Sequence, residues 1–139
     1  MPKARLVPNI RRVAERTRVS SGSPWEPKVG ISRAVRAGNR ILVSGTAPIW
    51  PDGSCDPDPE AQAHRCLEII LEALREAGAG AEHVVRTRIF LTSAEDGEAV
   101  ARAHATTFDQ ARPVSTMVAV GALLDPRWKV EIEAEAILD

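Results

Sequence analysis

Two runs of β-branched and apolar residues stand on either side of Gly38-Asn39. They cover residues 31–37 and 40–46. Glycine and asparagine tolerate the positive φ angles that a tight two-residue turn needs, so the pattern predicts a β-hairpin here. Before it, residues 16–21 alternate only weakly. The stretch "SSGSPWEPKVG" at 20–30 is rich in glycine, proline and serine and is predicted to be a loop.

Residues 58–77 have the periodicity of an amphipathic helix. Asp58-Pro59-Glu60 supplies an N-cap acceptor, a proline in the first helical turn and an acid near the positive end of the dipole. Gly78 follows as a left-handed C-cap. The apolar stripe recurs at intervals of three and four residues and consists of Ala63, Cys66, Leu67, Ile70, Leu71 and Leu74.

A strand is predicted over 84–92. Alternation assigns Val85, Thr87, Ile89 and Leu91 to one of its faces, and Val84, Arg86, Arg88 and Phe90 to the other. Strand, helix and strand in this order favour a right-handed parallel crossover. A second helix over about 97–110 and a strand over 114–120 follow. The second helix carries Val100, Ala103, His104, Thr107 and Phe108 on one side.

The last strand has an acid at every second position. Its pattern sets Lys129, Glu131, Glu133 and Glu135 against Val130, Ile132, Ala134 and Ala136. These elements predict an α+β fold with one mixed β-sheet and two helices packed against one face. The apolar residues of the strand then face the helices, and the glutamates share the uncovered face with Arg86 and Arg88. By itself, such a row is typical of a solvated polar face.

Length and charge narrow the class of protein. A chain of 139 residues with a net charge of −1 predicts a single domain, and argues against nucleic-acid or membrane electrostatics as the dominant interaction. Residues 1–20 nevertheless hold six basic residues and one acid, which favours a solvated N-terminal arm over residues 1–15. With no apolar window of about twenty residues and no signal-peptide pattern, we expect a cytoplasmic protein without a membrane span.

Motifs that carry chemistry are scarce. The sequence contains no phosphate-binding glycine loop, zinc-protease motif or nucleophile elbow, and we predict neither a cofactor nor a metal. Cys55 and Cys66 have no zinc-finger or redox spacing and are expected to be free thiols. Aromatic residues make up 4% of the chain, fewer than a stacking platform for nucleic acid needs.

Three stretches together resemble the Rid family, also called YjgF/YER057c/UK114 and labelled endoribonuclease L-PSP. They are "SRAVRAGNRILVSGTAP" at 32–48, "AQAHRCLEIILEALREAGAGAEHVVRTRIFLTS" at 61–93 and "PVSTMVAVGALLDPRWKVEIEAEA" at 113–136. The better-known members are enamine/imine deaminases. The resemblance implies a chorismate-mutase-like homotrimer that packs its sheets inward and binds a small molecule in clefts between subunits.

Carried onto this chain, the resemblance implies a site with Ser44, Thr116 and Glu131. Glu131 would help to position the hydrolytic water. In deaminase members an arginine two residues before the Ser/Thr/Cys position clamps the substrate carboxylate, but here that position is Val114. Further candidates for substrate contact are Ile31, Arg33 and Arg112. Ile31 replaces a frequent tyrosine, and Arg33 and Arg112 are the candidates to replace the missing clamp.

The sequence leaves three functions open. One is a Rid-type hydrolase or deaminase acting on an enamine, imine or related metabolite other than a simple 2-imino acid. Another is a trimer that binds a small ligand without chemistry. An endoribonuclease is the third, and it has the least support because the predicted cleft strands hold no histidine pair.

Overall fold

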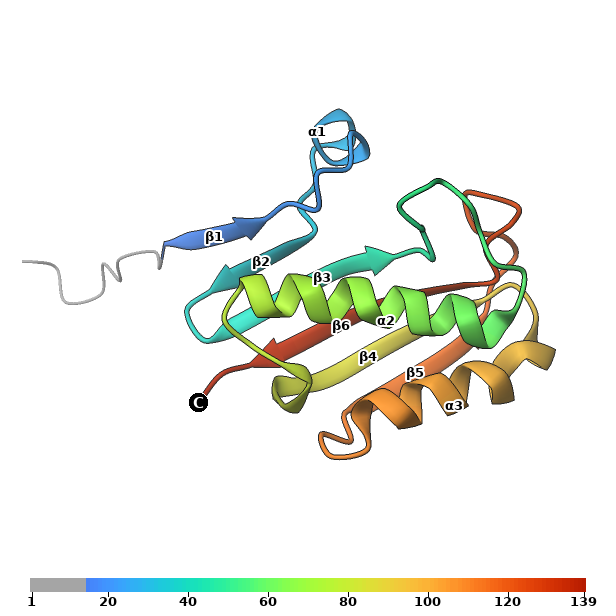
Figure 1. Cartoon of the computed structure of the whole chain (residues 1–139). Helices are drawn as coiled ribbons and strands as arrows, with labels where there is room; N and C mark the ends of the chain where they lie inside the picture. Colours follow the sequence, from blue (N-terminus) through green and yellow to red (C-terminus); the bar gives the residue numbers. More distant parts are fainter. Residues whose placement is uncertain (1–14) are drawn as a thin grey trace, which may run out of the picture.

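The computed structural model describes residues 15–139, which form one six-stranded mixed sheet (Figure 1). Its strand order is β1-β2-β3-β6-β4-β5. All neighbouring strands are antiparallel except β4 and β5, which are parallel. The strands are β1 Arg16–Val19, β2 Ala34–Ala37, β3 Arg40–Thr46, β4 Val84–Leu91, β5 Val114–Ala119 and β6 Val130–Ile137.

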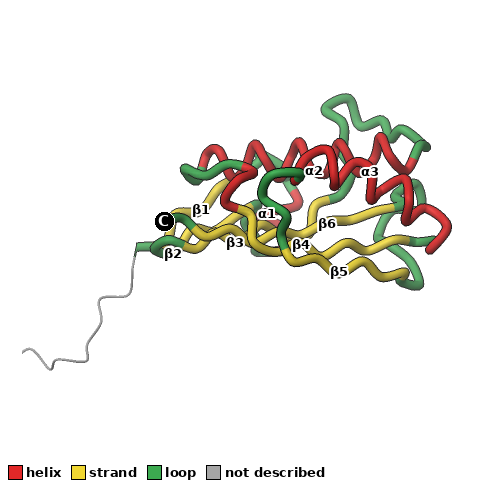
Figure 2. Tube along the Cα trace, turned by 90° about the horizontal axis from the view of Figure 1, so that it is seen from below, coloured by secondary structure: helices red, strands yellow, loops and turns green. Residues whose placement is uncertain are grey.

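Both long helices, α2 Pro59–Glu76 and α3 Gly97–Phe108, lie on the same side of the sheet, as Figure 2 shows from below. The predicted α+β architecture with two helices on one face is therefore confirmed. The core lies between these layers, where the α2 stripe meets the inward residues of β3, β4 and β6. Its largest fully buried apolar side chains are Ile41, Leu67, Ile70, Leu74, Ile89 and Ile132.

The signals at the ends of α2 act as the sequence predicts. The Asp58 carboxylate accepts a hydrogen bond from the backbone N–H of Ala61 at 2.8 Å, and Pro59 is the first helical residue. Gly78 has a φ of 92°, in the left-handed region that favours glycine. The hairpin is confirmed as well, because β2 and β3 pair on either side of Gly38-Asn39. Short helical turns at Ala81–His83 (η1) and Ala94–Asp96 (η2) precede β4 and α3.

The predicted loop at 20–30 contains a short helix, α1 Trp25–Val29. Gly30 ends it with a φ of 83° and donates its N–H to the carbonyl of Glu26. Pro27 fits because it lies in the first turn, where a helix has no N–H to lose. Strand β2 also begins at Ala34, three residues later than the hairpin prediction, and leaves Ile31 before it, 39% exposed.

The predicted faces of β4 are wrong at its start. Val84 is buried and Val85 is 38% exposed, the reverse of the simple alternation. The cause is a register irregularity between Val84 and Arg86 where β4 pairs with β6. An irregularity of this kind inserts a residue and shifts the alternation by one. From Arg86 onward the predicted faces hold.

The connection from β3 through α2 leads to β4, which runs in the same direction as β3. The two strands are not neighbours, however, since β6 lies between them and is antiparallel to both. The acidic strand thus occupies the middle of the sheet, and its outward residues face the side that α2 and α3 leave open. Among residues 15–139, no helix is both long and apolar enough to cross a membrane.

Candidate functional site

Two of the three outward glutamates of β6 have arginine partners on neighbouring strands. Arg88 of β4 donates to Glu133 at 2.9 Å, and Arg40 of β3 donates to Glu135. Each pair is cross-strand and partly exposed, so it contributes at most about 1 kcal/mol to stability. Of the two arginines placed on this face by the sequence, Arg88 pairs with a glutamate, whereas the partner of Glu135 is Arg40, which the sequence analysis did not single out.

Glu131 differs from its two neighbours. Its register partner on β4 is Phe90, and among residues 15–139 no side chain forms a hydrogen bond or ion pair with its carboxylate. Burial raises the pKa of Glu131, Arg33 lowers it in part, and the negative charge of Glu133 raises it further. A half-buried carboxylate without a partner among the residues that the structure describes is a candidate for binding or proton transfer.

The Glu131 carboxylate lies against a bulge in β3. Val43 pairs with Ala134 and Thr46 with Ile132, so Ser44 and Gly45 together stand opposite Glu133. A Cβ built on Gly45 would lie 2.9 Å from Oε2 of Glu131. Real Cβ atoms do not approach an oxygen so closely, and the absence of a side chain at position 45 is what leaves room for the carboxylate.

Ser44 and Arg33 are attached to the same bulge. The Ser44 hydroxyl donates to the carbonyl of Ser32 at 2.7 Å, and its backbone N–H donates to the carbonyl of Arg33 at 2.9 Å. The Arg33 guanidinium donates to the carbonyl of Gly45 at 3.1 Å and to Oγ1 of Thr46 at 3.0 Å. Three predicted site residues, Ser44, Arg33 and Glu131, therefore gather around Gly45.

The other predicted residues lie at the opposite edge of the sheet. Val114 is 63% exposed at the start of β5, and Thr116 is exposed in register with Arg88 of β4. Since β4 lies between β5 and β6, Thr116 stands about 10 Å from the Glu131 strand. Val114 is in addition displaced along the sheet, because its register row is that of Arg86 and Glu135.

Both arginines proposed to replace the missing clamp are engaged elsewhere within the chain. Arg112 has a φ of 44°, and its side chain turns back to donate from Nε to the carbonyl of Asp109 at 3.1 Å. Arg33 is held at the bulge in β3, and β6 and β4 lie between that strand and β5. Within one chain the predicted site is thus divided into a Glu131 half and a Val114/Thr116 half.

A residue missed by the sequence analysis fixes the entrance to β6. Gln62 of α2 is fully buried, and its amide N–H groups donate to the carbonyls of Asp56 at 2.7 Å and Arg127 at 3.0 Å. Its carbonyl accepts the backbone N–H of Lys129 at 2.8 Å, two residues before Glu131. The signal was present, because Gln62 is a polar residue four positions before Cys66 on the apolar stripe.

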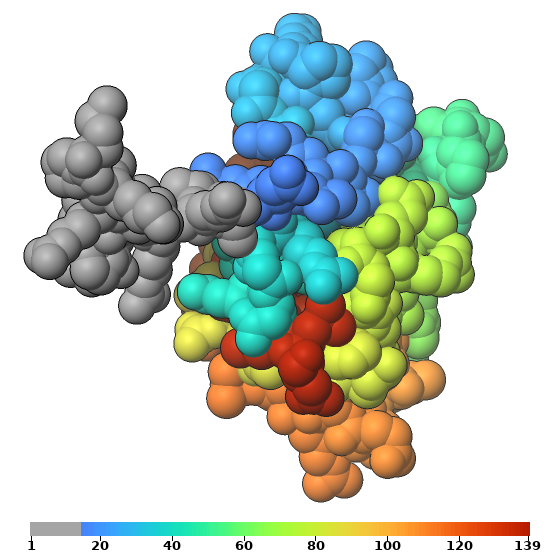
Figure 3. All heavy atoms as spheres, turned by 90° about the vertical axis from the view of Figure 1, so that its left-hand side faces the viewer, coloured from blue at the N-terminus to red at the C-terminus, as the bar shows by residue number. Residues whose placement is uncertain are grey.

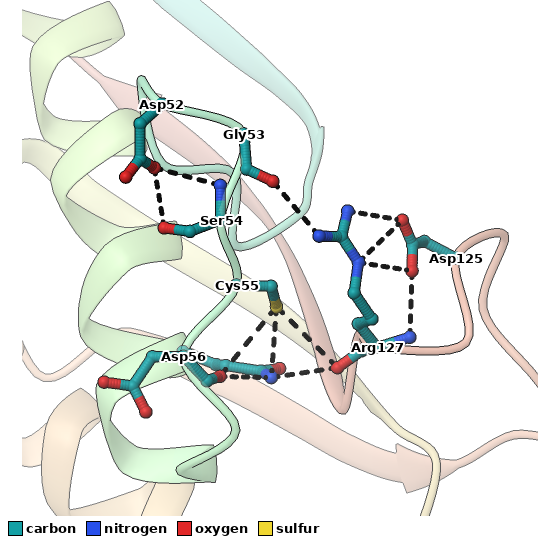
Figure 4. A network of polar contacts seen from close by, with 8 residues as sticks. Asp52, Gly53, Ser54, Cys55, Asp56, Asp125 and Arg127 are labelled. Atoms are coloured by element: carbon teal, nitrogen blue, oxygen red, sulfur yellow. Dashed lines mark hydrogen bonds and ion pairs between the residues drawn. The ribbon is translucent and has the colours of Figure 1, made fainter.

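The loops joined by Gln62 are also connected directly (Figure 4). Arg127 forms an ion pair with Asp125 at 2.9 Å and donates to the carbonyl of Gly53 at 3.1 Å. The side chain of Cys55, in the first of these loops, points to the second, with its sulfur 3.8 Å from the carbonyl of Arg127. These contacts hold residues 52–56 against residues 125–127 and fix the loop that leads into β6.

A second set of polar contacts links α3 to β4 and β5. Nε2 of His104 on α3 lies 2.8 Å from Oγ1 of Thr87, which is 2.8 Å from Oγ of Ser115. Burial lowers the pKa of His104. The described residues contain no cluster of three or more metal-ligating side chains, and Cys55 and Cys66 are both free. Burial raises the pKa of the Cys66 thiol, which favours its protonated, unreactive form.

The fold and this site define a class of protein: a small α+β domain with two helices over a mixed sheet and a carboxylate on the open face. The chain matches the family model described as endoribonuclease L-PSP over residues 23–138. It therefore belongs to this family, whose other names are YjgF/YER057c/UK114 and Rid, and the resemblance seen in the sequence is confirmed.

Individual relatives agree with this assignment. The chain is 43% identical to the uncharacterized protein SCO2049 of Streptomyces coelicolor, over 86% of this chain and 90% of the relative. It is 36% identical to protein DfrA of Myxococcus xanthus, over 92% and 99% of the two chains. Among solved structures, Rv2704 of Mycobacterium tuberculosis, a member of the YjgF/YER057c/UK114 family, superposes with a TM-score of 0.82 at 44% identity, covering 89% of this chain and all of that one.

Proposed function

We propose that this protein is a Rid-type hydrolase or deaminase that acts on a small enamine, imine or related metabolite in the cytoplasm. The observation that carries the proposal is that Glu131 is half-buried and unpaired among the described residues. Its two neighbours on β6 are paired with arginines, whereas Glu131 has no partner in the described part of its chain and a raised pKa. A protein that used this strand only for stability would gain by pairing or removing that charge.

In the proposed reaction the Glu131 carboxylate orients a water molecule and takes its proton as the oxygen adds to the carbon of a C=N bond. The proton passes to the nitrogen and gives a carbinolamine. The hydroxyl proton of this intermediate then moves to the nitrogen as the C–N bond breaks, and the products are a carbonyl compound and ammonia or an amine. A raised pKa suits this role, since a base works best when its pKa lies near the working pH. Thr116 or Ser44 would hydrogen-bond the substrate.

The divided site supports an assembly. Thr116 and Val114 cannot contact a ligand held at Glu131 of the same chain across two strand spacings of about 5 Å each. A homotrimer in which the open faces pack inward would bring the β5 edge of one subunit to the bulge of its neighbour. The open face also exposes Leu42, Val114 and Val118 at 43% or more, and Arg86 has no ion pair in the described chain.

Assembly can be tested by mass. Three chains of 15.0 kDa give a particle of about 45 kDa. Sedimentation at micromolar concentration should report that mass. A mass near that of one chain would remove the trimer and the intersubunit placement of Thr116, Val114 and Glu131.

The ligand is proposed to differ from a simple 2-imino acid. Val114 offers no hydrogen bond to a carboxylate, and within one chain Arg33 donates to the Gly45 carbonyl while Arg112 donates to the Asp109 carbonyl. The same absence supports the alternative function, a trimer that binds a small neutral ligand in the cleft without turning it over. The endoribonuclease named in the family description stays a third possibility, and the basic arm of residues 1–15 lies almost wholly outside the described residues.

The deciding experiment is ammonia release from a panel of neutral and carboxylated imines generated in solution. We expect turnover of neutral imines by the natural protein and a loss of about 10²–10⁴-fold in Glu131→Gln. Glu133→Gln is the matched control on the same strand and should keep its rate. Equal rates in the natural protein and Glu131→Gln would reject the hydrolase. Binding of an imine analogue without any turnover would establish the ligand-binding alternative.

A further inference from the structure

Arg33 is largely buried, and one of its hydrogen-bond donors has no partner in the described part of the chain. Its Nε–H is enclosed and has no hydrogen-bond partner among the described residues, although Nη1 and Nη2 are both engaged. Burial lowers the pKa of Arg33, while Glu26 and Glu131 act in the opposite direction. An unpaired buried donor costs free energy, so the position calls for a compensating contact.

That contact is the bulge of β3. Nη2 of Arg33 donates to the carbonyl of Gly45, and Nη1 donates to the hydroxyl of the fully buried Thr46. A bulge leaves some backbone N–H and C=O groups without a partner on the neighbouring strand. Arg33 supplies the missing donor for one of these carbonyls, that of Gly45. Gly45 therefore has Arg33 at its carbonyl and Glu131 against its α-carbon.

Glu26 of α1 acts on Arg33 through its charge, although no ion pair joins these two side chains. Glu26 is 5% exposed and accepts hydrogen bonds from the Ser20 hydroxyl at 2.9 Å and the Ser21 N–H at 3.2 Å. Burial alone would raise its pKa, but the bonds from Ser21 and Ser20 together with Arg33 hold it below the ordinary value. An ionised Glu26 thus favours the charged form of the buried arginine.

We propose that Arg33 is a positioning residue for Glu131: it holds the Gly45 bulge in the shape that receives the Glu131 carboxylate, and Glu26 anchors it from α1. This inference rests on the proposed function for its link to turnover, but its structural part does not. It assigns Arg33 a role other than direct contact with substrate.

The location of Arg33 agrees with this role. Arg33 lines a pocket of about 370 Å³ with Ser20, Ser21 and one face of α2, on the helix-covered side of the sheet. Figure 3 shows the blue segment of residues 15–30 beside the yellow-green end of α2. Val114 and Thr116, by contrast, belong to the far edge strand. A ligand in contact with Thr116 would meet Glu131 from the open face, with the bulge backbone between it and Arg33.

The test uses Arg33→Gln and Arg33→Lys in the full-length protein. Arg65→Gln is the matched control, because Arg65 lines the same pocket and also donates to a backbone carbonyl, that of Ile49, at 2.7 Å. The first readout is the pKa of Glu131 from a carbon-13 carboxyl titration, with the resonance assigned by its loss in Glu131→Gln. The second is amide hydrogen exchange at residues 44–46.

In Arg33→Gln we expect the Glu131 pKa to shift upward and exchange at 44–46 to become faster. Arg33→Lys should keep the pKa near its natural value, since it keeps the charge, but should still speed exchange because it lacks the forked donor. Arg65→Gln should change neither. An unchanged Glu131 pKa together with unchanged exchange in Arg33→Gln would overturn the proposal.

Glu26→Gln is the second variant, and it keeps the test valid if Arg33→Gln does not fold. We expect faster exchange at residues 44–46 in Glu26→Gln, and natural exchange there would remove Glu26 as the anchor. Where turnover is found, the acid limb of the pH–rate profile should move to higher pH in Arg33→Gln. The Glu131 pKa could shift in Arg33→Gln while Glu131→Gln changes the rate of no reaction in the panel. That pair of results would reject the proposed function and still support the positioning role of Arg33.

Discussion

Gly45 and Glu131 are complementary in shape: a side chain at position 45 would place its Cβ 2.9 Å from Oε2 of the glutamate. The glycine is not required by its φ angle, since it is not among the positive-φ residues. Its role is to leave space for a carboxylate that has no partner in the described chain. The relationship connects a bulge in β3 with the one unpaired acid of the β6 row.

Gly45→Ala should therefore affect the site more than the fold. The clashing atom is the end of a flexible side chain, so Glu131 can rotate away and unfolding free energy should change by no more than about 1 kcal/mol. Turnover of a responsive imine should fall at least about tenfold, because a displacement of about 1 Å already misplaces a catalytic group. Gly121→Ala, with open space around its Cβ, is the control. Natural activity in Gly45→Ala would separate the bulge from the site.

Glu131→Gln should make the protein more stable at neutral pH. The raised pKa means that the folded chain binds this proton more tightly than the unfolded chain, so ionisation of Glu131 costs stability above the folded pKa. That cost disappears as the pH falls through the raised pKa toward the ordinary value of 4.5. Urea unfolding of both proteins at about pH 7 and about pH 4 should show a gap that closes on acidification. If this difference in unfolding free energy widens on acidification, the pKa of Glu131 is lowered by folding and the prediction is wrong.

Val114→Arg should create activity toward carboxylated imines. A bidentate arginine contact contributes about 1.5–3 kcal/mol, which corresponds to roughly ten- to over a hundredfold in kcat/KM. Steady-state rates on a 2-imino acid measure the gain, and Val85→Arg, at another exposed valine on the start of β4, provides the control. If Val114→Arg brings no gain, the cleft differs from the arginine-bearing members at more than this position.

Gln62→Ala should be strongly destabilising. The variant removes three short hydrogen bonds and opens a cavity. It leaves the Lys129 N–H without a partner and the Asp56 and Arg127 carbonyls with only the weak contact of the Cys55 thiol, for a cost of about 2–4 kcal/mol. Gln110→Ala is the control, since Gln110 is exposed and bonds only to Asp109 among the described residues. Chemical denaturation measures both. A Gln62→Ala protein as stable as the control would show that water replaces the amide.

Acidification should weaken the fold through His104. Burial lowers its pKa from 6.5, so the unfolded chain binds this proton more readily than the folded one. Stability is complete above pH 6.5 and is lost as the pH falls below that value toward the folded pKa. His104→Gln should flatten the stability curve in that window, whereas His64→Gln on α2 should keep its slope. The same slope in His104→Gln as in the natural protein would assign the effect to another group.

Most of the fold follows from local signals in the sequence. The alternation of β6, the stripe of α2 with its Asp58 and Gly78 ends, and the Gly38-Asn39 turn each specify an element because they act within one helix or hairpin. The motifs at 32–48, 61–93 and 113–136 also identified the family. Where the prediction failed, the deciding contacts are a register irregularity at Val84 and, in α1, hydrogen bonds from Ser20 and Ser21 to Glu26 within the segment 20–30, which the glycine and proline content had marked as a loop.

The sequence by itself determined that Glu131, Glu133 and Glu135 share a face, since side chains alternate along any strand. The family resemblance pointed to Glu131 among them, but only the tertiary structure decided what makes it differ from the other two. Register placed Arg88 and Arg40 beside two of the glutamates and Phe90 beside the third, and the bulge placed Gly45 under it. Pairing across strands depends on which residues 40 to 100 positions apart come into register, and no local pattern along the chain carries that information.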